Sequence, residues 1–327
     1  MTAKGKKRLK TALLALGILL LLIGAVYGGI LMRDAIYSNN YAKILNDAGI
    51  YSAGQDAEEP HAQTELAAKI TEHFSSALPE GKNVKKALII GLDGTRADAI
   101  VNAKEGISGI LELKAQGGLY PVYCGGDEGA LQDTSTAPGW ATLLTGSWAL
   151  EDGGHGVTGN SKPKGVEPKT ILTSLAEDNK ISSADFIVSW NGHLVNRRAT
   201  YAQEAAYTKE QSLPINWQTT AGDDETFSAA KEKLEAGDDL VFLIFEYCDH
   251  TGHTSSFGND NPLYREAFLT ADKQAKRLID AVKARPSYES EDWLIIMTTD
   301  HGGTGLSHGG QTDTQRLIWV ASNKPLW

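Results

Sequence analysis

The sequence of 327 residues contains only two cysteines, Cys124 and Cys248. Two cysteines cannot form a disulfide framework, so the fold must be held together by a buried core. A chain of this length can bury enough apolar surface to be stable without cross-links. The two cysteines either pair with each other in an oxidising compartment or remain buried thiols, and both alternatives are open at this stage.

Basic residues are scarce beyond the first ten positions. Five of the 31 lysines and arginines lie there, which leaves 26 against 41 acidic residues and a net charge of −15 for the rest of the chain. A surface of that charge excludes binding of a nucleic-acid duplex through a basic face. The sequence also contains no internal repeat and no low-complexity segment.

The N-terminal residues differ in composition from the rest of the chain. A basic stretch, 1–10, precedes an uncharged run, 11–32, whose 22 residues are long enough to cross a bilayer as a helix. The basic flank favours a cytoplasmic N-terminus. A signal peptide cleaved within 25–29 is the alternative, but the apolar run is longer than such peptides usually have. We therefore expect a single-pass protein of the cell membrane with a cytoplasmic tail (1–10), a transmembrane anchor (11–32), a helical stalk or linker (33–80) and an extracytoplasmic domain (81–327).

Apolar runs alternate with helical patterns through the rest of the sequence. The runs 87–92, 240–247 and 293–298 predict buried strands. Further strands are expected at 119–123, 184–189 and 316–321, and helices at 64–78, from 97, and at 107–116, 139–145, 169–179, 223–236 and 264–282. This alternation indicates an α/β fold with a mostly parallel central sheet and helices on both faces.

The predicted central strands end in residues that commonly bind metal ions. These residues are Asp93, Asp249, His253, Asp300 and His301, with His308 seven positions after His301. Because ligands of such sheets bind beyond the carboxyl ends of the strands, we expect one shared site. Three carboxylates and three imidazoles would serve two divalent ions about 4 Å apart, of a kind that clamps a displacement at phosphorus. Mixed nitrogen and oxygen ligands favour Zn²⁺, with Mn²⁺ as the alternative.

A candidate nucleophile, Thr136, precedes the helix expected at 139–145. Thr136 stands where a helix N-cap is expected, with Pro138 in the first turn. Backbone N–H groups and the helix dipole favour anions there, and a hydroxyl beside a metal ion can ionise and attack phosphorus. Thr136 can instead be only a cap, and Thr134 and Ser135 are neighbouring candidates that spacing does not exclude.

Seven short motifs occur in order between residues 87 and 310. They are Asp93-Gly94, Thr136-Ala137-Pro138, Thr145-Gly146, His155-Gly156 with Asn160, Trp190-Asn191-Gly192, Asp249-His250-Thr251-Gly252-His253 and Asp300-His301-Gly302. This ordered set resembles the alkaline phosphatase superfamily, and most closely its nucleotide pyrophosphatase/phosphodiesterase branch. Each motif by itself is weak evidence for this family, and the occurrence of all of them in this order is strong evidence.

The resemblance implies a fold, a chemistry and roles for individual residues. It implies an alkaline phosphatase-like sheet and a threonine nucleophile that forms a covalent phospho-enzyme. One zinc ion would be held by Asp249, His253 and His308, and the other by Asp93, Asp300 and His301 together with the Thr136 oxygen, while Asn160 would donate a hydrogen bond to a phosphoryl oxygen. His308 follows Asp300 sooner than in the phosphodiesterases, which leaves the substrate less defined than the chemistry.

Several functions fit these observations. The leading interpretation is a hydrolase of phosphodiester or pyrophosphate bonds that acts on a nucleotide or a lipid head-group. A phosphomonoesterase, a transferase of a phospho-head-group from membrane lipid, and a non-catalytic metal-binding surface domain are the alternatives. The transferases usually carry several membrane helices. Sulfatases of the superfamily use a Cys or Ser in a Cys/Ser-x-Pro-x-Arg motif, whereas Thr136-Ala137-Pro138 is followed by Gly139-Trp140, with no Arg.

Aromatic residues provide the candidate substrate pocket. Trp190, His193 and Tyr201 are expected to line it, since aromatic faces stack on bases and sugars. Core packing is an equally good interpretation of Trp190. His155, on a glycine-rich loop, is expected to be structural.

Overall fold

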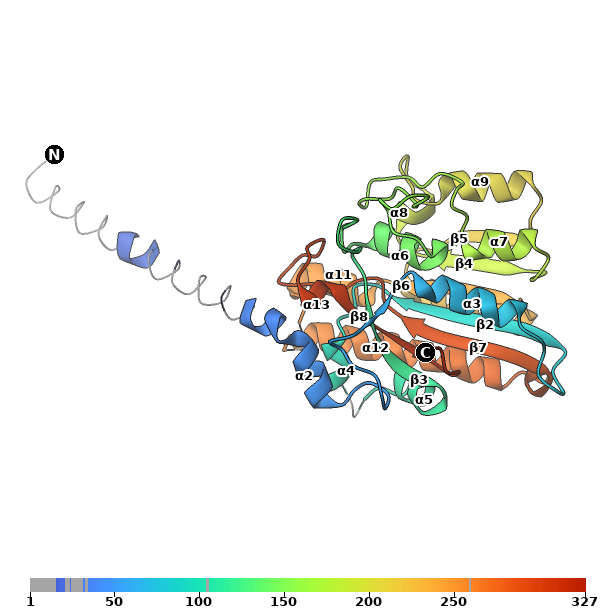
Figure 1. Ribbon diagram of the computed structural model, residues 1–327, viewed down its shortest axis with the longest axis horizontal. Helices are drawn as coiled ribbons and strands as arrows, with labels where there is room; N and C mark the ends of the chain where they lie inside the picture. Colours follow the sequence, from blue (N-terminus) through green and yellow to red (C-terminus); the bar gives the residue numbers. More distant parts are fainter. Residues whose placement is uncertain (1–15, 21–23, 25–31, 33–34, 104–105, 259) are drawn as a thin grey trace, which may run out of the picture. The chain divides into compact units, whose positions relative to one another are not determined.

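A twisted eight-stranded sheet runs through the large unit of the computed structural model (Figure 1). The structure describes residues 16–20, 24, 32, 35–103, 106–258 and 260–327, and the chain divides into two compact units, 1–41 and 42–327. Most of the expected anchor, 11–32, lies outside the described residues. Among those described, no helix combines the length and the apolar character needed to cross a membrane.

The strand order is β1-β3-β8-β7-β2-β6-β4-β5. The strands are β1 (His61–Ala62), β2 (Val84–Leu92), β3 (Gly118–Tyr123), β4 (Ala184–Val188), β5 (Ile215–Thr219), β6 (Leu240–Phe245), β7 (Glu291–Thr298) and β8 (Leu317–Ser322). Only β8 among these strands runs antiparallel to its neighbours, β3 and β7. The predicted α/β fold with a mostly parallel central sheet is thus confirmed.

Helices cover both faces of the sheet (Figure 1). The helices of the described residues are α2 (Tyr41–Ala48), α3 (Glu65–Ser75), α4 (Asp98–Asn102), α5 (Gly109–Gln116), α6 (Thr136–Thr145), α7 (Ile171–Glu177), α8 (Asn191–Leu194), α9 (Ala202–Glu210), α10 (Asp223–Ala236), α11 (Tyr247–Ser255), α12 (Pro262–Lys283), η1 (Tyr288–Ser290) and α13 (Asp313–Arg316). Helices α3, α6 and α7 pack together over one face, and α5, α10 and α12 pack over the other. The central strands are therefore apolar on both sides, as their near-continuous hydrophobic sequences predict.

The segment expected to form a stalk or linker, 33–80, contains elements of the large unit. Strand β1 pairs with β3, and helix α3 packs against β2, α6 and α7. In α3, Leu66, Ile70 and Phe74 recur every four residues, so one face of the helix is apolar and lies in the core. Residues 42–80 thus belong to the same compact unit as the sheet.

Cys124 and Cys248 are both buried and both free. They do not form the disulfide that the sequence left open. The core around the sheet is apolar packing, which for a unit of this size is sufficient without a cross-link.

Candidate active site

The six predicted metal ligands meet at the carboxyl edge of the sheet. Strand β2 leads into Asp93, and the adjacent β7 leads into Asp300 and His301. The strand on the other side of β2, β6, is followed directly by α11, which carries Asp249 and His253. These two residues are four apart on a helix, so their side chains share one face. The loop after β7 then returns His308 to the same place.

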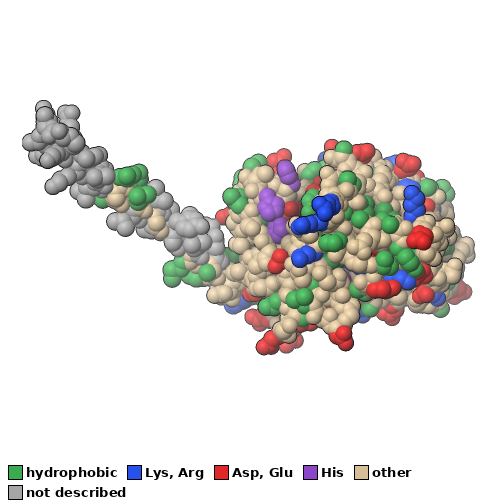
Figure 2. Space-filling model, turned by 90° about the horizontal axis from the view of Figure 1, so that it is seen from above, with side chains coloured by type: hydrophobic (Ala, Val, Ile, Leu, Met, Phe, Trp, Pro, Cys, Tyr) green, Lys and Arg blue, Asp and Glu red, His purple; other side chains and the backbone are tan. Residues whose placement is uncertain are grey.

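Three of the six ligands form a first group. The Nε2 atom of His308 lies 3.5 Å from Asp249 Oδ1, and Nε2 of His253 lies 3.5 Å from Asp249 Oδ2. The two Nε2 atoms of His253 and His308 are 3.0 Å apart. This is the group that the resemblance assigns to one zinc ion. Figure 2 shows histidine side chains reaching the surface together on one face of the protein.

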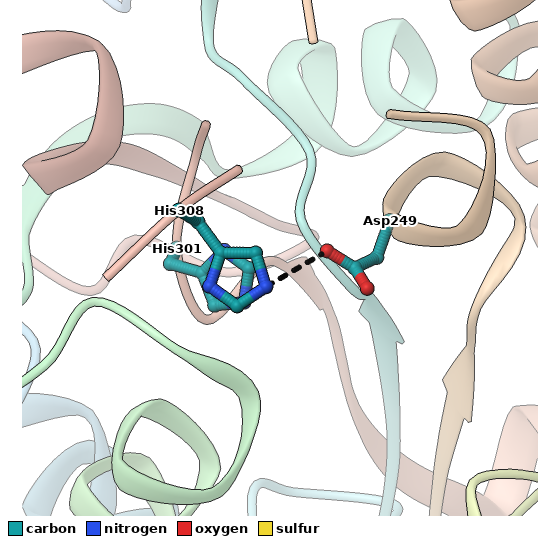
Figure 3. Close-up of side chains that lie close together, drawn as sticks. All are labelled: Asp249, His301 and His308. Atoms are coloured by element: carbon teal, nitrogen blue, oxygen red, sulfur yellow. Dashed lines mark ion pairs between the residues drawn. The ribbon is translucent and has the colours of Figure 1, made fainter. Parts of the chain in front are cut away.

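The other three ligands form a second, fully buried group. His301 Nε2 lies 3.5 Å from Asp93 Oδ1 and 3.4 Å from Asp300 Oδ2. The ring of His301 also stacks on that of His308, with centroids 4.1 Å apart, and faces Asp249 (Figure 3). His301 is therefore within reach of both groups, so the structure brings all six residues into one continuous cluster.

The backbone fixes the proton on each of the three imidazoles. Nδ1 of His253 lies 3.0 Å from the carbonyl of Leu306, Nδ1 of His301 lies 2.7 Å from that of Gly302, and Nδ1 of His308 lies 3.1 Å from that of Thr134. A carbonyl oxygen only accepts hydrogen bonds, so each Nδ1 carries the proton. In the neutral ring, Nε2 then presents a lone pair, and the three Nε2 atoms are those that face the carboxylates. This is the arrangement that metal-ligating histidines adopt.

Burial makes the cluster unfavourable without a positive charge at its centre. Burial raises the pKa of Asp93 and Asp300 well above the usual range, and neighbouring carboxylates raise it further. Burial also lowers the pKa of His301 well below its usual value and that of His308 to about 4, so the rings are neutral near pH 7. Asp249 Oδ1, Asp300 Oδ2 and His301 Nε2 are buried without a hydrogen-bond partner among the described residues. Carboxylate oxygens and neutral imidazoles in this state fit divalent metal ions.

Thr136 lies beside the second group. It is the first residue of α6, and the N-cap position is held by Ser135, whose backbone is extended. The expectation that Thr136 is the N-cap is therefore wrong, because the helix starts three residues earlier than the apolar pattern indicated. The Thr136 hydroxyl donates to Asp93 Oδ1 at 3.5 Å and lines the cavity next to the cluster.

Asn160 also lines this cavity and is held in a defined orientation. Its Oδ1 accepts a hydrogen bond of 2.9 Å from the backbone N–H of Ala137, in the first turn of α6. The side-chain Nδ2 is then the group that can donate to a ligand. Asn160 is therefore in a position to donate a hydrogen bond to an anion bound at the start of α6.

The cavity has a volume of about 650 Å³ and extends from the metal cluster across the ends of β6, β4 and β5. Its walls are formed by Thr136, Asn160, Ser189, Trp190, Ala221, Gly222, Asp223, Glu246, Tyr247, Asp249, His250, Thr251, His253 and His308. Trp190 lines it as predicted, although its other side packs against α6. A cavity of this size accommodates a small organic group next to the proposed nucleophile.

The other two predicted pocket residues do not line the cavity. His193 and Tyr201 are fully buried, and their rings stack on each other with centroids 5.8 Å apart. Both pack against Phe186 of β4. Their sequence proximity to Trp190 was misleading, because the chain turns inward at α8 and places them in the core.

Two residues near the site have roles that the sequence did not reveal. Trp140 Nε1 donates a hydrogen bond to Asp93, and Glu246 occupies the cavity wall. A tryptophan in an apolar helix and a glutamate after a strand both have common structural explanations. His155, in contrast, is structural as expected: its Nε2 lies 3.0 Å from the Thr142 hydroxyl, and its Nδ1 accepts from Val157 N–H.

Side chains of the metal-ligating types at the carboxyl edge of a parallel sheet, with a hydroxyl at a helix start beside them, are typical of the active sites of metal-dependent α/β enzymes. The particular family follows from sequence comparison. A profile of the type I phosphodiesterase/nucleotide pyrophosphatase family matches residues 87–318, and the chain belongs to that family. The family consists of hydrolases that are typically metal-dependent. A search of curated proteins finds no match.

The chain is less similar to proteins of solved structure. Murine ectonucleotide pyrophosphatase/phosphodiesterase 5 is 20% identical over 67% of this chain and 58% of its own, with a TM-score of 0.48. A 2-O GAG sulfatase is 11% identical over 74% of this chain and 65% of its own, with a TM-score of 0.48. Lipoteichoic acid synthase LtaP from Listeria monocytogenes is 11% identical over 79% of this chain and 71% of its own, with a TM-score of 0.45. The chain thus spans 58% of the murine protein, and the family assignment depends on the profile alone.

Proposed function

We propose that the protein is a membrane-anchored hydrolase of phosphodiester or pyrophosphate bonds that binds two divalent ions and uses Thr136 as its nucleophile. The single observation that supports this most strongly is the pair of Nε2 atoms on His253 and His308, 3.0 Å apart. Both rings carry their proton on Nδ1, so no hydrogen bond can join the two Nε2 atoms. Two lone pairs held this close and facing Asp249 are suited to a cation bound between them, and this supports the proposed metal site.

The ligand set supports Zn²⁺, with Mn²⁺ as the alternative. Asp249, His253 and His308 would hold one ion, and Asp93, Asp300 and His301 the other. Ions at these positions would neutralise the charge on a phosphoryl group and lower the pKa of a nearby hydroxyl. The unpartnered buried atoms on Asp249, Asp300 and His301 would be satisfied in that state.

The reaction has two steps. In the first, the Thr136 oxygen forms a bond to phosphorus as the bond from phosphorus to the leaving oxygen breaks, and the hydroxyl proton departs with the leaving oxygen. Asp93 Oδ1, 3.5 Å from the hydroxyl, is positioned to receive its hydrogen bond, and the Asn160 Nδ2 group would hold a phosphoryl oxygen. In the second step, the oxygen of water forms a bond to phosphorus as the bond from phosphorus to the Thr136 oxygen breaks, and one proton of the water restores the Thr136 hydroxyl.

The proposed location is the cell membrane, with the catalytic domain outside the cytoplasm. The basic residues 1–10 followed by the uncharged run 11–32 support this topology. Protease added to intact cells should digest the domain and leave a short membrane-associated fragment. Complete protection of the domain until the cells are lysed would reverse the proposed orientation.

The function is tested by assaying the full chain in detergent on bis(4-nitrophenyl) phosphate and 4-nitrophenyl phosphate side by side. We expect the diester to be hydrolysed faster, because the cavity beside Thr136 has room for a substituent on phosphorus. Hydrolysis of the monoester alone would identify a phosphomonoesterase. No hydrolysis of either ester by protein with two bound ions would identify a non-catalytic metal-binding domain, or a transferase if a hydroxylated acceptor restores turnover.

A further inference from the structure

The segment that carries Asn160 has little backbone support. The described residues between α6 and α7 form no helix or strand. Within 158–166, which the structure describes in full, one backbone–backbone hydrogen bond reaches another segment, from the Lys164 N–H to the Thr200 carbonyl at 2.8 Å. Asn160 nevertheless meets the Ala137 N–H in one defined orientation. Side chains must therefore fix this segment in place.

Lys164 is the side chain that fixes it. This residue is fully buried, and its Nζ donates hydrogen bonds of 3.1 Å to the carbonyls of Gly165 and Val166. The same Nζ lies 3.0 Å from Oε2 of Glu204 on α9. An ammonium group has three N–H bonds, so these three partners use all of them. The segment is thus folded around the ammonium group and joined through it to α9.

Glu204 is itself held from the other side. Its Oε1 accepts hydrogen bonds from the Thr170 N–H at 2.8 Å, from the Thr170 hydroxyl at 2.9 Å and from the Thr173 hydroxyl at 2.6 Å. Thr170 is the N-cap of α7, and Thr173 lies in the first turn of that helix. Both α7 and α9 contact β5, the strand at one edge of the sheet (Figure 1). The position of the carboxylate is therefore determined by two helices that pack on the sheet.

Stability alone does not explain a charged pair at this place. Burial lowers the pKa of Lys164, and the charge of Glu204 opposes this effect without cancelling it. Apolar side chains of similar volume often stabilise a core as well as a buried ion pair or better, because no charge has to leave water. Charged hydrogen bonds differ from apolar contacts in fixing direction as well as distance. The pair is thus better explained by a need for exact placement of the segment.

Asn160 lies between two fixed points of the segment. Val157, three residues before it, is buried in a small apolar cluster with Ala137 and Ala141 of α6. Lys164 lies four residues after it. The Ala137 N–H is in the first turn of α6, where backbone donors have no partner within the helix, and Asn160 Oδ1 accepts from it at 2.9 Å. The amide of Asn160 is therefore oriented by contacts on both sides of it.

We propose, building on the function proposed above, that Lys164 and Glu204 form a positioning pair, which holds Asn160 so that its Nδ2 group points at the phosphoryl group beside Thr136. Neither member of the pair touches the substrate, and both act through Asn160. A donor must meet a phosphoryl oxygen closely in the transition state, and a displacement of about 1 Å by a distant change can be costly in rate. The pair therefore determines kcat/KM as well as the fold.

The test is a double-mutant cycle between the positioning pair and Asn160. Removing Lys164 alone would leave Glu204 buried without its partner and destabilise the chain strongly. The pair is therefore removed as Lys164→Met together with Glu204→Gln, called the pair variant, in which the amide oxygen still accepts from Thr170 and Thr173. Where the pair variant melts below the assay temperature, Glu204→Gln alone takes its place.

The full chain in detergent is assayed on bis(4-nitrophenyl) phosphate as wild type, pair variant, Asn160→Ala and their combination. We expect Asn160→Ala to lower kcat/KM on the order of 100-fold, the cost of one lost donor to a developing charge. The pair variant should lower kcat/KM on the order of tenfold. In the Asn160→Ala background it should lower kcat/KM no further, because the residue through which it acts is absent.

A second buried pair, Lys86 and Asp239, provides the matched control. Nζ of Lys86 donates to Asp239 Oδ1 at 2.9 Å and to the Gly237 carbonyl at 2.6 Å. This pair lies near the amino ends of β2 and β6, away from the metal cluster at their carboxyl ends. Lys86→Met together with Asp239→Asn should shift the midpoint of urea unfolding about as much as the pair variant does and leave kcat/KM unchanged.

Amide exchange at Ala137 provides a measurement that needs no activity. Its N–H has Asn160 Oδ1 as its acceptor, so exchange reports whether Asn160 is in place. Deuterium uptake, resolved to single residues by mass spectrometry with fragmentation, should be faster in Asn160→Ala and in the pair variant. It should be unchanged in the control with Lys86→Met and Asp239→Asn.

Two results would overturn the proposal. One is a loss of kcat/KM by the same factor in the presence and in the absence of Asn160, which a purely structural pair would produce. The other is unchanged exchange at Ala137 in the pair variant. If the wild type with bound metal hydrolyses no ester, the proposed function fails and the exchange measurement still decides on the positioning pair. If it hydrolyses the diester and the cycle is additive, the function stands and the positioning pair is rejected.

Discussion

The indole Nε1 of Trp140 donates a hydrogen bond of 2.8 Å to Oδ2 of Asp93, the carboxylate at the end of the central strand. The ring of Trp140 lies directly against β2 at Gly91, where an added Cβ would be 2.4 Å from the nearest ring carbon. A glycine is therefore required for this close approach. One oxygen of Asp93 is fixed by the indole, which leaves Oδ1 facing Thr136 and His301.

Trp140→Phe should weaken metal binding or activity roughly 10- to 100-fold, the usual cost of losing a hydrogen bond to a metal ligand. The phenyl ring keeps most of the packing, so the loss should be larger in activity than in stability. Trp148→Phe is the control, because Trp148 is also buried and donates to a carboxylate, Asp127, away from the cluster. Similar losses in both variants, measured by zinc titration and diester hydrolysis, would show a general packing effect.

Protein purified without chelator should contain about two divalent ions per chain by elemental analysis. Removing them should abolish hydrolysis and lower the melting temperature, because ions that bind only the folded state stabilise it. His253→Ala should lower the metal content, whereas His250→Ala on the same helix should not. Full activity at a metal content near zero would contradict the two-ion site.

Thr136→Ala should lower kcat on the order of 10³-fold with little change in KM, since a nucleophile acts in the transition state. Thr136→Ser retains the hydroxyl and should keep measurable activity, and acid-quenched wild type should contain phosphothreonine by mass spectrometry. Ser135→Ala is the control, because Ser135 is the N-cap but makes no side-chain capping hydrogen bond. Loss of activity in Ser135→Ala but not in Thr136→Ala would move the nucleophile by one residue.

Glu291 at the start of β7 should contribute stability that depends on pH. Burial pushes the pKa of its carboxyl upward, but hydrogen bonds from Arg285, Trp293 and Ser287 outweigh burial and lower the pKa to about 2. Because this pKa is lower than in the unfolded chain, the stabilisation is fully present above about pH 4.5 and is lost as pH falls towards 2.

Glu291→Gln should therefore lower the free energy of unfolding by about 3 kcal/mol near pH 7, and by progressively less in acid. Urea unfolding between pH 3 and pH 7 measures the difference from wild type. The exposed Glu289→Gln, two residues earlier, is the control and should show no such trend. A difference between wild type and Glu291→Gln that stays constant over this range would contradict the linkage.

The sequence predicted that the candidate metal ligands lie close together, because this prediction depended on physical features of the strands. A buried strand is recognisable from its apolar run, and parallel strands share one carboxyl edge, so residues after 92, 245 and 298 had to meet. Amphipathic helices were equally clear, and α10 spans the predicted residues, 223–236. These features depend on local pattern together with a single rule of topology.

The sequence was less informative about strands that are only partly buried and about the direction in which side chains point. Strand β5, INWQT, lies at the sheet edge and is only half-buried, so its polar residues hid it within an unpatterned segment. The apolar run 240–247 ends as a strand at Phe245, and its last residue, Tyr247, already begins α11. The inward direction of His193 and Tyr201 depends on the path of the chain around α8, which no periodicity encodes.

The order of the strands in the sheet has a consequence for how the protein is made. Strand β2 lies between β6 and β7, which are synthesised much later, at 240–245 and 291–298. Until they emerge from the ribosome, the most apolar strand of the N-terminal half has two open edges, a state prone to pairing with other chains. Since Asp93 follows β2 and His308 follows β7, a nascent chain cannot bring all six candidate metal ligands together before residue 308 has been translated.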